Sequence, residues 1–167
     1  MASYWTRKDD QSGELTTVKP WEEILGHGDR NVPHLRYHVV CGVVEQDGRF
    51  LCMQKGQTKY AYTTDKWEFP GGKVKSGESP ERALHRELQE EMDYDVKVGD
   101  FLGEVTHTYP DFTISMQAFF CSAVSHELHC KEHQSFRWCS VEEMDELDWC
   151  EADKAIVGML KKNMCRV

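Results

Sequence analysis

Residues 71–92 read GGKVKSGESPERALHRELQEEM, and they are the most informative stretch of the chain. A glycine-rich loop runs directly into a segment with helical periodicity. Ser79 is a favourable N-cap residue and Pro80 suits the first position of a helix, so we expect a helix over 80–92. The glycines at 71 and 72 let the backbone come close to a ligand.

The expected helix carries an apolar stripe and, beside it, a group of three carboxylates. At about 100° per residue, the stripe that we expect to face the core consists of Leu84, Leu88 and Met92. Glu87, Glu90 and Glu91 fall within an arc of about 100° on the adjoining face, where like charges repel by about 0.2–0.5 kcal/mol per exposed pair. Arg86 lies elsewhere on the wheel, so we expect nothing within one turn to offset all three charges.

Two interpretations of this acidic face compete. It is either a solvated helix surface, which is common, or a set of oxygen ligands for a hard divalent cation such as Mg²⁺ or Mn²⁺. Lys73 and Lys75 add positive charge to the glycine loop of an otherwise acidic chain. The loop and the helix together favour a metal site that accepts a phosphate ligand.

Strand-like runs lie on both sides of this segment. Asp47-Gly48 between two apolar runs is a hairpin signal, and residues 55–65 are polar and loop-like. The expected strands cover 38–44, 50–53, 101–108, 112–124 and 136–139, and a second helix covers 152–162. This pattern predicts an α/β fold in which a mixed β-sheet packs between helices as an α/β/α sandwich.

The chain divides near Tyr37. Residues 1–36 form a polar N-terminal extension, and residues 37–167 form the domain itself. Scattered aromatic side chains favour an extension that packs on the body, with packing on a partner or an unpacked tail as the alternatives. Within the extension, Pro20 suits the first turn of a short helix that ends at Gly26.

Composition excludes several classes of protein. The 167 residues correspond to roughly one domain. A net charge of −9 is the opposite of what binding to a nucleic-acid polymer requires. No run reaches eighteen apolar residues, so we expect no membrane span, and the polar N-terminus does not resemble a secretory signal. Seven single cysteines without a Cys-x-x-Cys pair indicate a reducing, cytoplasmic compartment.

Gly72, Glu78 and the run Arg86-Glu87-Leu88-Gln89-Glu90-Glu91 together resemble the Nudix box. The similarity to MutT-type nucleoside triphosphate pyrophosphohydrolases covers roughly residues 38–162 and includes Trp67-Glu68-Phe69-Pro70, Tyr109-Pro110-Asp111-Phe112 and Lys131-Glu132-His133-Gln134. One position departs, because the family usually has glycine where this chain has Asp93, at the end of the helix. Aspartate tolerates the left-handed conformation required there at a cost of about 1 kcal/mol.

The resemblance implies a metal-dependent active site in a Nudix fold. The metal ligands would be the carbonyl oxygen of Gly72 and the side chains of Glu87, Glu90, Glu91 and Glu132, with Mg²⁺ as cofactor and Mn²⁺ as its substitute. The catalytic residues would be Glu87, Glu132, Arg86 and Glu78. Among these, Glu87 is the first candidate for the general base and Glu132 the second, while Arg86 and Glu78 orient the glutamates of the box.

The same resemblance implies hydrolysis of a nucleoside triphosphate to the monophosphate and pyrophosphate. The substrate-binding residues would be Lys55, Lys73, Phe69, Tyr109 and Asp153. Asp153 stands where enzymes that remove oxidised guanine nucleotides have asparagine; a carboxylate only accepts hydrogen bonds, whereas an amide also donates them. An acceptor suits cytosine as well as guanine, so 8-oxo-dGTP and CTP or a modified dCTP both stay open as substrates.

Two other classes of function compete with this enzyme. A Nudix-like module that binds a base without hydrolysis usually loses glutamates of the box, and this chain keeps them all. An acidic interaction domain would explain the helix but not the glycine loop. The sequence does not decide between a monomer and a homodimer.

Overall fold

The computed structural model describes residues 5–8, 15–18 and 34–166. Strands β1 (Trp5–Lys8) and β2 (Leu15–Val18) pair antiparallel as a separate two-stranded sheet. The helix expected over 20–26 lies outside the described residues, and the packing of the extension on the body stays a prediction.

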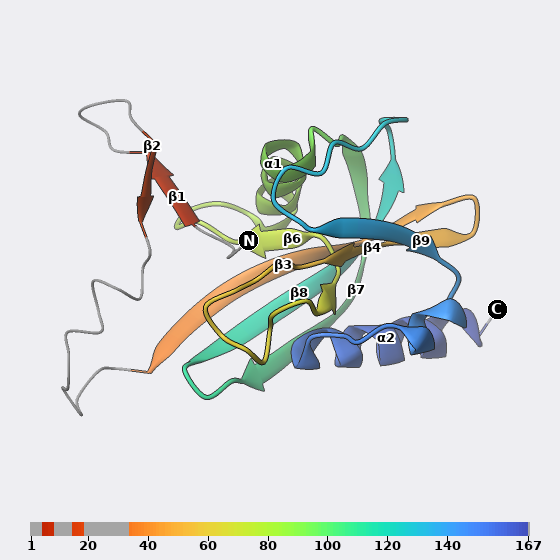
Figure 1. The fold of residues 1–167 in the computed structure, drawn as a ribbon. Helices are drawn as coiled ribbons and strands as arrows, with labels where there is room; N and C mark the ends of the chain where they lie inside the picture. Colours follow the sequence, from red (N-terminus) through yellow and green to blue (C-terminus); the bar gives the residue numbers. More distant parts are fainter. Residues whose placement is uncertain (1–4, 9–14, 19–33, 167) are drawn as a thin grey trace.

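Seven strands form the main sheet (Figure 1). They are β3 (Leu35–Gln46), β4 (Arg49–Gln54), β5 (Trp67–Glu68), β6 (Gly71–Lys73), β7 (Val96–Thr108), β8 (Phe112–Ala123) and β9 (Ser135–Cys139). Their order is β5-β4-β3-β8-β7, with β6 paired to β3 and β9 paired to β4. Strands β3 and β8 run parallel and the other pairs antiparallel, so the sheet is mixed, as predicted.

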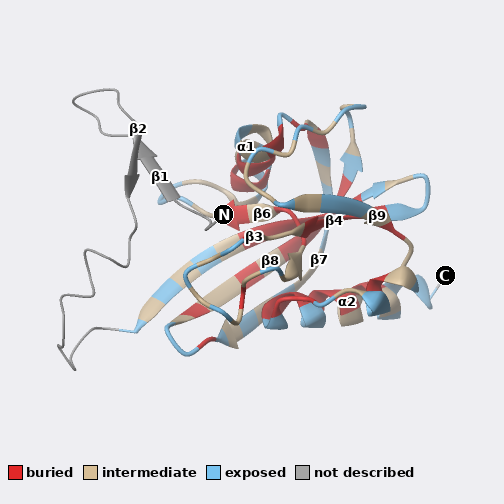
Figure 2. Cartoon of the chain, in the orientation of Figure 1, coloured by how far each residue is buried: buried red, intermediate tan, exposed pale blue. Residues whose placement is uncertain are grey.

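Two α-helices cover opposite faces of this sheet, α1 (Pro80–Met92) and α2 (Glu151–Met164), and a short 3₁₀ helix, η1 (Glu143–Glu146), precedes α2 (Figure 1). Buried apolar side chains form one cluster between α1 and the sheet and a second between α2 and the sheet, and the buried positions follow the inner sides of both helices (Figure 2). The predicted α/β/α sandwich is therefore confirmed.

The hairpin between β3 and β4 has the predicted turn. Both central residues have positive φ, 52° at Asp47 and 75° at Gly48, as a type I′ turn requires.

Strand β7 differs from its prediction because it begins at Val96 rather than Phe101. Its pairing with β8 shifts register between Val98 and Gly103, which breaks the alternation from which its start would be predicted.

Helix α1 begins and ends as its sequence predicts. The Ser79 hydroxyl accepts a hydrogen bond from the Arg82 amide at 3.2 Å, and Leu84, the first residue of the apolar stripe, is fully buried. At the C-terminus Asp93 adopts the left-handed conformation, with φ 49° and ψ 35°, in the place of the family's usual glycine. Among the described residues, no helix combines the length and the hydropathy that a membrane span requires.

Candidate active site

The glycine loop and helix α1 meet at Gly72 and Glu87. Strand β6 is paired to β3, which places Gly72 directly against the helix. A Cβ atom added to Gly72 would lie 2.3 Å from Cδ of Glu87 and 2.5 Å from its Oε2, closer than any real contact. Glycine is therefore needed here so that the backbone can approach a buried carboxylate.

Arg86 is the centre of the charge network on this helix. Its guanidinium donates to both carboxylate oxygens of Glu78, at 2.7 and 3.0 Å, to Glu87 Oε1 at 2.8 Å and to Glu90 Oε2 at 3.2 Å. It also donates to the carbonyl oxygen of Lys73 at 3.0 Å. Hydrogen bonding to Arg86 holds the pKa of Glu78 at about 2.

Nothing within one turn offsets all three glutamates, as expected, but Arg86 reaches two of them, which its place on the helical wheel did not predict. A helical wheel records the direction in which a side chain leaves the helix. The guanidinium of Arg86 lies at the end of a long side chain and presents five N–H donors, so it reaches two carboxylates on the neighbouring arc. Its expected role in orienting Glu87 and Glu90 agrees with these hydrogen bonds.

Glu91 lacks the compensation that Arg86 gives to its neighbours. Its Oε2 atom is buried and has no hydrogen-bond partner among the described residues. Burial, together with the charges of Glu87 and Glu132, raises the pKa of Glu91 well above its usual range. Burial also raises the pKa values of Glu87 and Glu132.

An unpartnered carboxylate oxygen among further carboxylates is the arrangement that a hard cation would stabilise, so these residues fit a divalent metal.

The carboxylate oxygens of the box glutamates lie farther apart than the ligand atoms of a site already closed around a metal. Among the described residues, one group of three His, Cys, Asp or Glu side chains has all its ligand atoms within 4.8 Å of one another, and that group is Glu68, Cys150 and Asp153.

The loop that carries Glu132 is attached to the end of α1. The His129 amide donates to the carbonyl oxygen of Met92 at 3.0 Å, and the Lys131 amide donates to that of Glu91 at 3.1 Å. The Lys131 ammonium also pairs with Asp93 at 2.7 Å. These contacts explain how Glu132, far from the box in the sequence, joins the glutamates of the helix.

A second polar cluster is centred on Glu68 of β5. Its two oxygens contact Lys55 Nζ at 3.1 Å and His133 Nε2 at 2.9 Å. Burial opposes ionisation of Glu68, but Lys55 and His133 outweigh it and hold its pKa at about 2. Lys55, expected to face the phosphates, is therefore paired with a carboxylate.

Asp153 lies next to this cluster. Its Oδ1 accepts a hydrogen bond from the Phe69 amide at 3.0 Å, and Cys150, not Asp153, is the N-cap of α2. Burial and the neighbouring charge of Glu68 raise the pKa of Asp153 to about 8. A raised pKa favours the protonated carboxyl, which can donate as well as accept, whereas the sequence analysis considered an acceptor alone.

The two expected aromatic walls are buried. Phe69 stacks on Trp149 with ring centroids 4.8 Å apart, and the Tyr109 hydroxyl accepts from the Ala152 amide at 3.2 Å. Tyr62, which sequence reasoning did not select, stacks on Tyr109 at 5.4 Å with an interplanar angle of 12° and is only partly buried. It lies in the loop of residues 55–65, whose generally polar sequence gave no signal of this contact.

Lys73 lies over an aromatic ring. Its Nζ atom is 3.7 Å from the centroid of the Tyr37 ring, a cation–π contact between β6 and β3. Burial lowers the pKa of Lys73 to about 8. Of the two lysines expected to bind phosphate, Lys55 thus contacts the Glu68 carboxylate and Lys73 contacts the Tyr37 ring.

Glu68, Cys150 and His133 were missed by sequence reasoning. Glu68 lies within the Trp67-Glu68-Phe69-Pro70 stretch and His133 follows Glu132, so both were noted only as parts of motifs.

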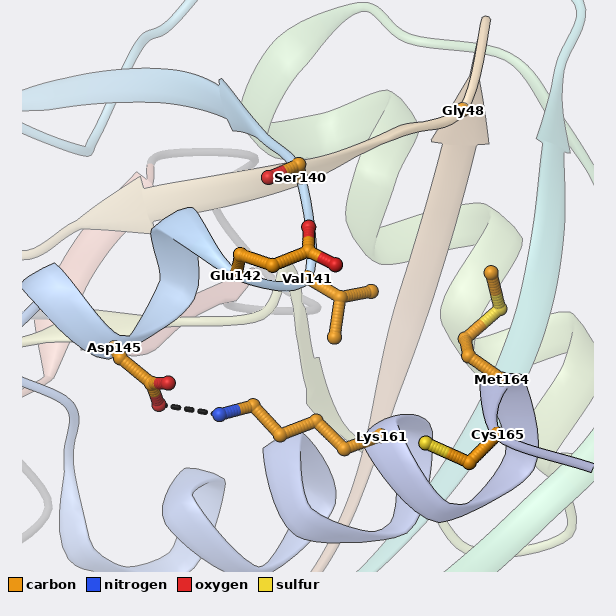
Figure 3. Close-up of a pocket in the computed structure, with 8 residues that line it drawn as sticks. All are labelled: Gly48, Ser140, Val141, Glu142, Asp145, Lys161, Met164 and Cys165. Carbon is orange, nitrogen blue, oxygen red and sulfur yellow. Dashed lines mark hydrogen bonds and ion pairs between the residues drawn. The ribbon is translucent and has the colours of Figure 1, made fainter.

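A pocket separate from the candidate active site lies between the β3–β4 turn, η1 and the end of α2, and it contains none of the predicted site residues (Figure 3). It is lined by Gly48, Ser140, Val141, Glu142, Asp145, Lys161, Met164 and Cys165.

The chain belongs to the Nudix family, because the model of the NUDIX domain matches residues 34–161. It is 34% identical over 116 residues to the CTP pyrophosphohydrolase of Escherichia coli (strain K12), covering 69% of this chain and 84% of that protein. It is 31% identical over 129 residues to the putative 8-oxo-dGTP diphosphatase 2 of Mycobacterium tuberculosis (strain ATCC 25618 / H37Rv), covering 75% and 89%. The solution structure of the E. coli ORF135 protein is similar, with a TM-score of 0.65, 30% identity and coverage of 77% and 91%. The protein is thus a MutT-type Nudix hydrolase, of a family that uses divalent metals.

Proposed function

We propose that this enzyme hydrolyses a (deoxy)nucleoside triphosphate to the monophosphate and pyrophosphate, with Mg²⁺ as its metal and Mn²⁺ as a substitute. The observation that carries this proposal is the unpartnered, buried Oε2 of Glu91 beside Glu87 and Glu132. A base-binding module would not need these carboxylates, and an acidic interaction domain would not bury them.

The chain's own residues have distinct tasks in this reaction. Glu87, Glu90, Glu91 and Glu132 would hold the metal together with the carbonyl oxygen of Gly72. When bound, divalent cations neutralise the phosphate chain and stabilise the charge that develops on it. Arg86 binds one oxygen of Glu87 and one of Glu90 and is itself fixed by Glu78, so the carboxylates are oriented before substrate arrives.

We assign the general base to Glu87 and keep Glu132 as the second candidate. Burial raises the pKa of both carboxyls, which makes each a stronger base than an exposed glutamate. Arg86 occupies only Oε1 of Glu87, so Oε2, which faces Gly72, can take a proton from the attacking water.

The nucleobase would bind beside Asp153, with Phe69 and Tyr109 behind it and Lys55 and Lys73 toward the phosphates. A protonated Asp153 resembles asparagine, because it offers both a donor and an acceptor. This supports an oxidised guanine nucleotide such as 8-oxo-dGTP as substrate. CTP or a modified dCTP is the second candidate, supported by the similarity to a CTP pyrophosphohydrolase.

A panel of nucleotides tests this proposal. We would measure kcat/KM for 8-oxo-dGTP, dGTP, CTP and 5-methyl-dCTP with Mg²⁺, with Mn²⁺ and with excess EDTA. We expect turnover with either metal and none in EDTA, with 8-oxo-dGTP preferred. Turnover of CTP but not of 8-oxo-dGTP would make CTP the first candidate substrate. Full activity in EDTA would refute the metal mechanism.

The thiols support a proposal for the cellular location. All seven cysteines are free, and the structure buries five of them. Free thiols in this number fit a reducing compartment, so we propose that the enzyme acts in the cytoplasm on the free nucleotide pool.

A further inference from the structure

His133 has a largely covered side chain and lies next to the loop glutamate that the proposed mechanism uses. Its side chain is only 7% exposed, and its Nε2 lies 2.9 Å from Glu68 Oε1. An ionised Glu68 carboxylate can only accept, so Nε2 carries the proton and donates. The other ring nitrogen, Nδ1, is buried and has no hydrogen-bond partner in the part of the chain that the structure describes.

The hydrogen bond between His133 and Glu68 holds the chain on the C-terminal side of Glu132. Immediately beyond His133, the Gln134 amide donates to the carbonyl oxygen of Gln54 at 2.9 Å, where the chain enters β9. On the other side of Glu132, the Lys131 amide is bonded to the end of α1. Glu132 therefore lies on a short bridge between helix α1 and strands β4 and β5.

We propose that His133 is a positioning residue whose hydrogen bond to Glu68 holds the Glu132 carboxylate toward Glu87 and Glu91. This inference rests on the proposed function, in which Glu132 acts at the metal. A short loop with its anchor removed can rotate its side chains by an ångström or more, and a displacement of that size costs about 10²-fold in rate when the displaced group is catalytic.

Two other roles for His133 would give different results. A histidine that only fills the core would affect the free energy of unfolding and leave the kcat of the folded enzyme unchanged. A histidine that acts through Glu68 on Lys55, and so on substrate binding, would affect KM. The loss of Glu132 placement instead lowers kcat, while Lys55 keeps its pairing with Glu68.

The test compares His133→Gln with His133→Asn. The amide nitrogen of glutamine reaches about as far as Nε2, whereas that of asparagine reaches only as far as Nδ1, so the two variants differ mainly in the hydrogen bond to Glu68. We expect His133→Asn to lower kcat by about 10-fold or more with KM changed less than about 2-fold, and His133→Gln to keep kcat within about 3-fold of wild type. His133→Met, which has no donor, is expected to match His133→Asn and replaces it if that variant does not fold.

The second arm repeats His133→Asn in a Glu132→Gln background. If His133 acts through Glu132, the additional loss in kcat is less than about 2-fold there, because residues that act as a unit are not additive. Equal kcat values for the Asn and Gln variants, a rise in KM at unchanged kcat, or additive losses would each overturn the inference while the wild-type enzyme stays active. A wild-type enzyme that turns over no nucleotide would instead refute the proposed function and the inference with it.

Discussion

Replacing Glu91 by glutamine should stabilise the metal-free protein and disable the enzyme. In the folded chain the pKa of Glu91 is raised by burial and by Glu87 and Glu132, so its ionised form opposes folding. The protonated Glu91 carboxyl therefore contributes stability below its unfolded pKa of about 4.3, and this contribution is lost as pH rises toward the folded pKa. The loss in the free energy of unfolding is about 1.4 kcal/mol for each pH unit that separates the two pKa values. Glutamine does not titrate, and its amide can donate to the neighbouring carboxylates.

We therefore expect Glu91→Gln, at pH 7 and without metal, to raise the free energy of unfolding by about 1–3 kcal/mol, the cost of an unsatisfied buried polar group. For a chain of this length each kcal/mol raises Tm by about 2–4 °C. The difference should shrink below about pH 4, where the wild-type carboxyl is protonated. Glu45→Gln, an exchange at an exposed position of β3, is the matched control and should leave Tm unchanged.

Added Mg²⁺ should stabilise the wild-type protein more than Glu91→Gln. A ligand at about 100 times its Kd stabilises the folded state by about 2.7 kcal/mol, and this gain should be much smaller for a variant that has lost one ligand. The kcat of Glu91→Gln should fall by about 10²-fold or more. A variant that is destabilised without metal, or that gains as much Tm from Mg²⁺ as wild type does, would refute the assignment of Glu91 as a buried metal ligand.

Three further predictions concern the loop and the base pocket. Gly72→Ala forces a Cβ against Glu87 and should lower kcat by about 10²-fold, whereas Gly158→Ala, where the added Cβ meets nothing, should leave kcat unchanged in the same assay. Asp153→Asn should flatten the dependence of Tm on pH between about pH 4 and 8. The folded pKa of Asp153 is raised to about 8, so the stability that this group contributes is present below its unfolded pKa and is lost as pH rises through 8. An unchanged Tm–pH profile would exclude a protonated Asp153. Asp153→Ala should lower kcat/KM by about 5- to 150-fold for the preferred nucleotide and spare poor substrates, whereas equal losses across the nucleotide panel would remove Asp153 from base recognition.

Local signals made much of the fold predictable. The cap at Ser79, the proline after it and the apolar stripe all lie within or next to helix α1, and the Asp47-Gly48 turn needs only its own two residues. The start of β7 was not predictable in this way, because its register shifts depend on how the strand pairs with β8.

The site was predictable where it follows a motif and not where it depends on contacts between distant segments. The shared face of Glu87, Glu90 and Glu91 could be predicted from spacing, whereas the place of Gly72 beside Glu87 was implied only by the resemblance to the Nudix box. The raised pKa of Asp153 arises from burial and from Glu68, which only the fold brings near. The role of Glu68 itself depends on Lys55 and His133, which come from two other segments.

The most direct test of the proposed reaction is the identity of the phosphorus products, measured by ³¹P NMR during hydrolysis of 8-oxo-dGTP and CTP with Mg²⁺ and again with excess EDTA. We expect a nucleoside monophosphate and pyrophosphate in equal amounts with Mg²⁺ and no products in EDTA. A nucleoside diphosphate with inorganic phosphate, or product formation that continues in EDTA, would contradict the proposed reaction.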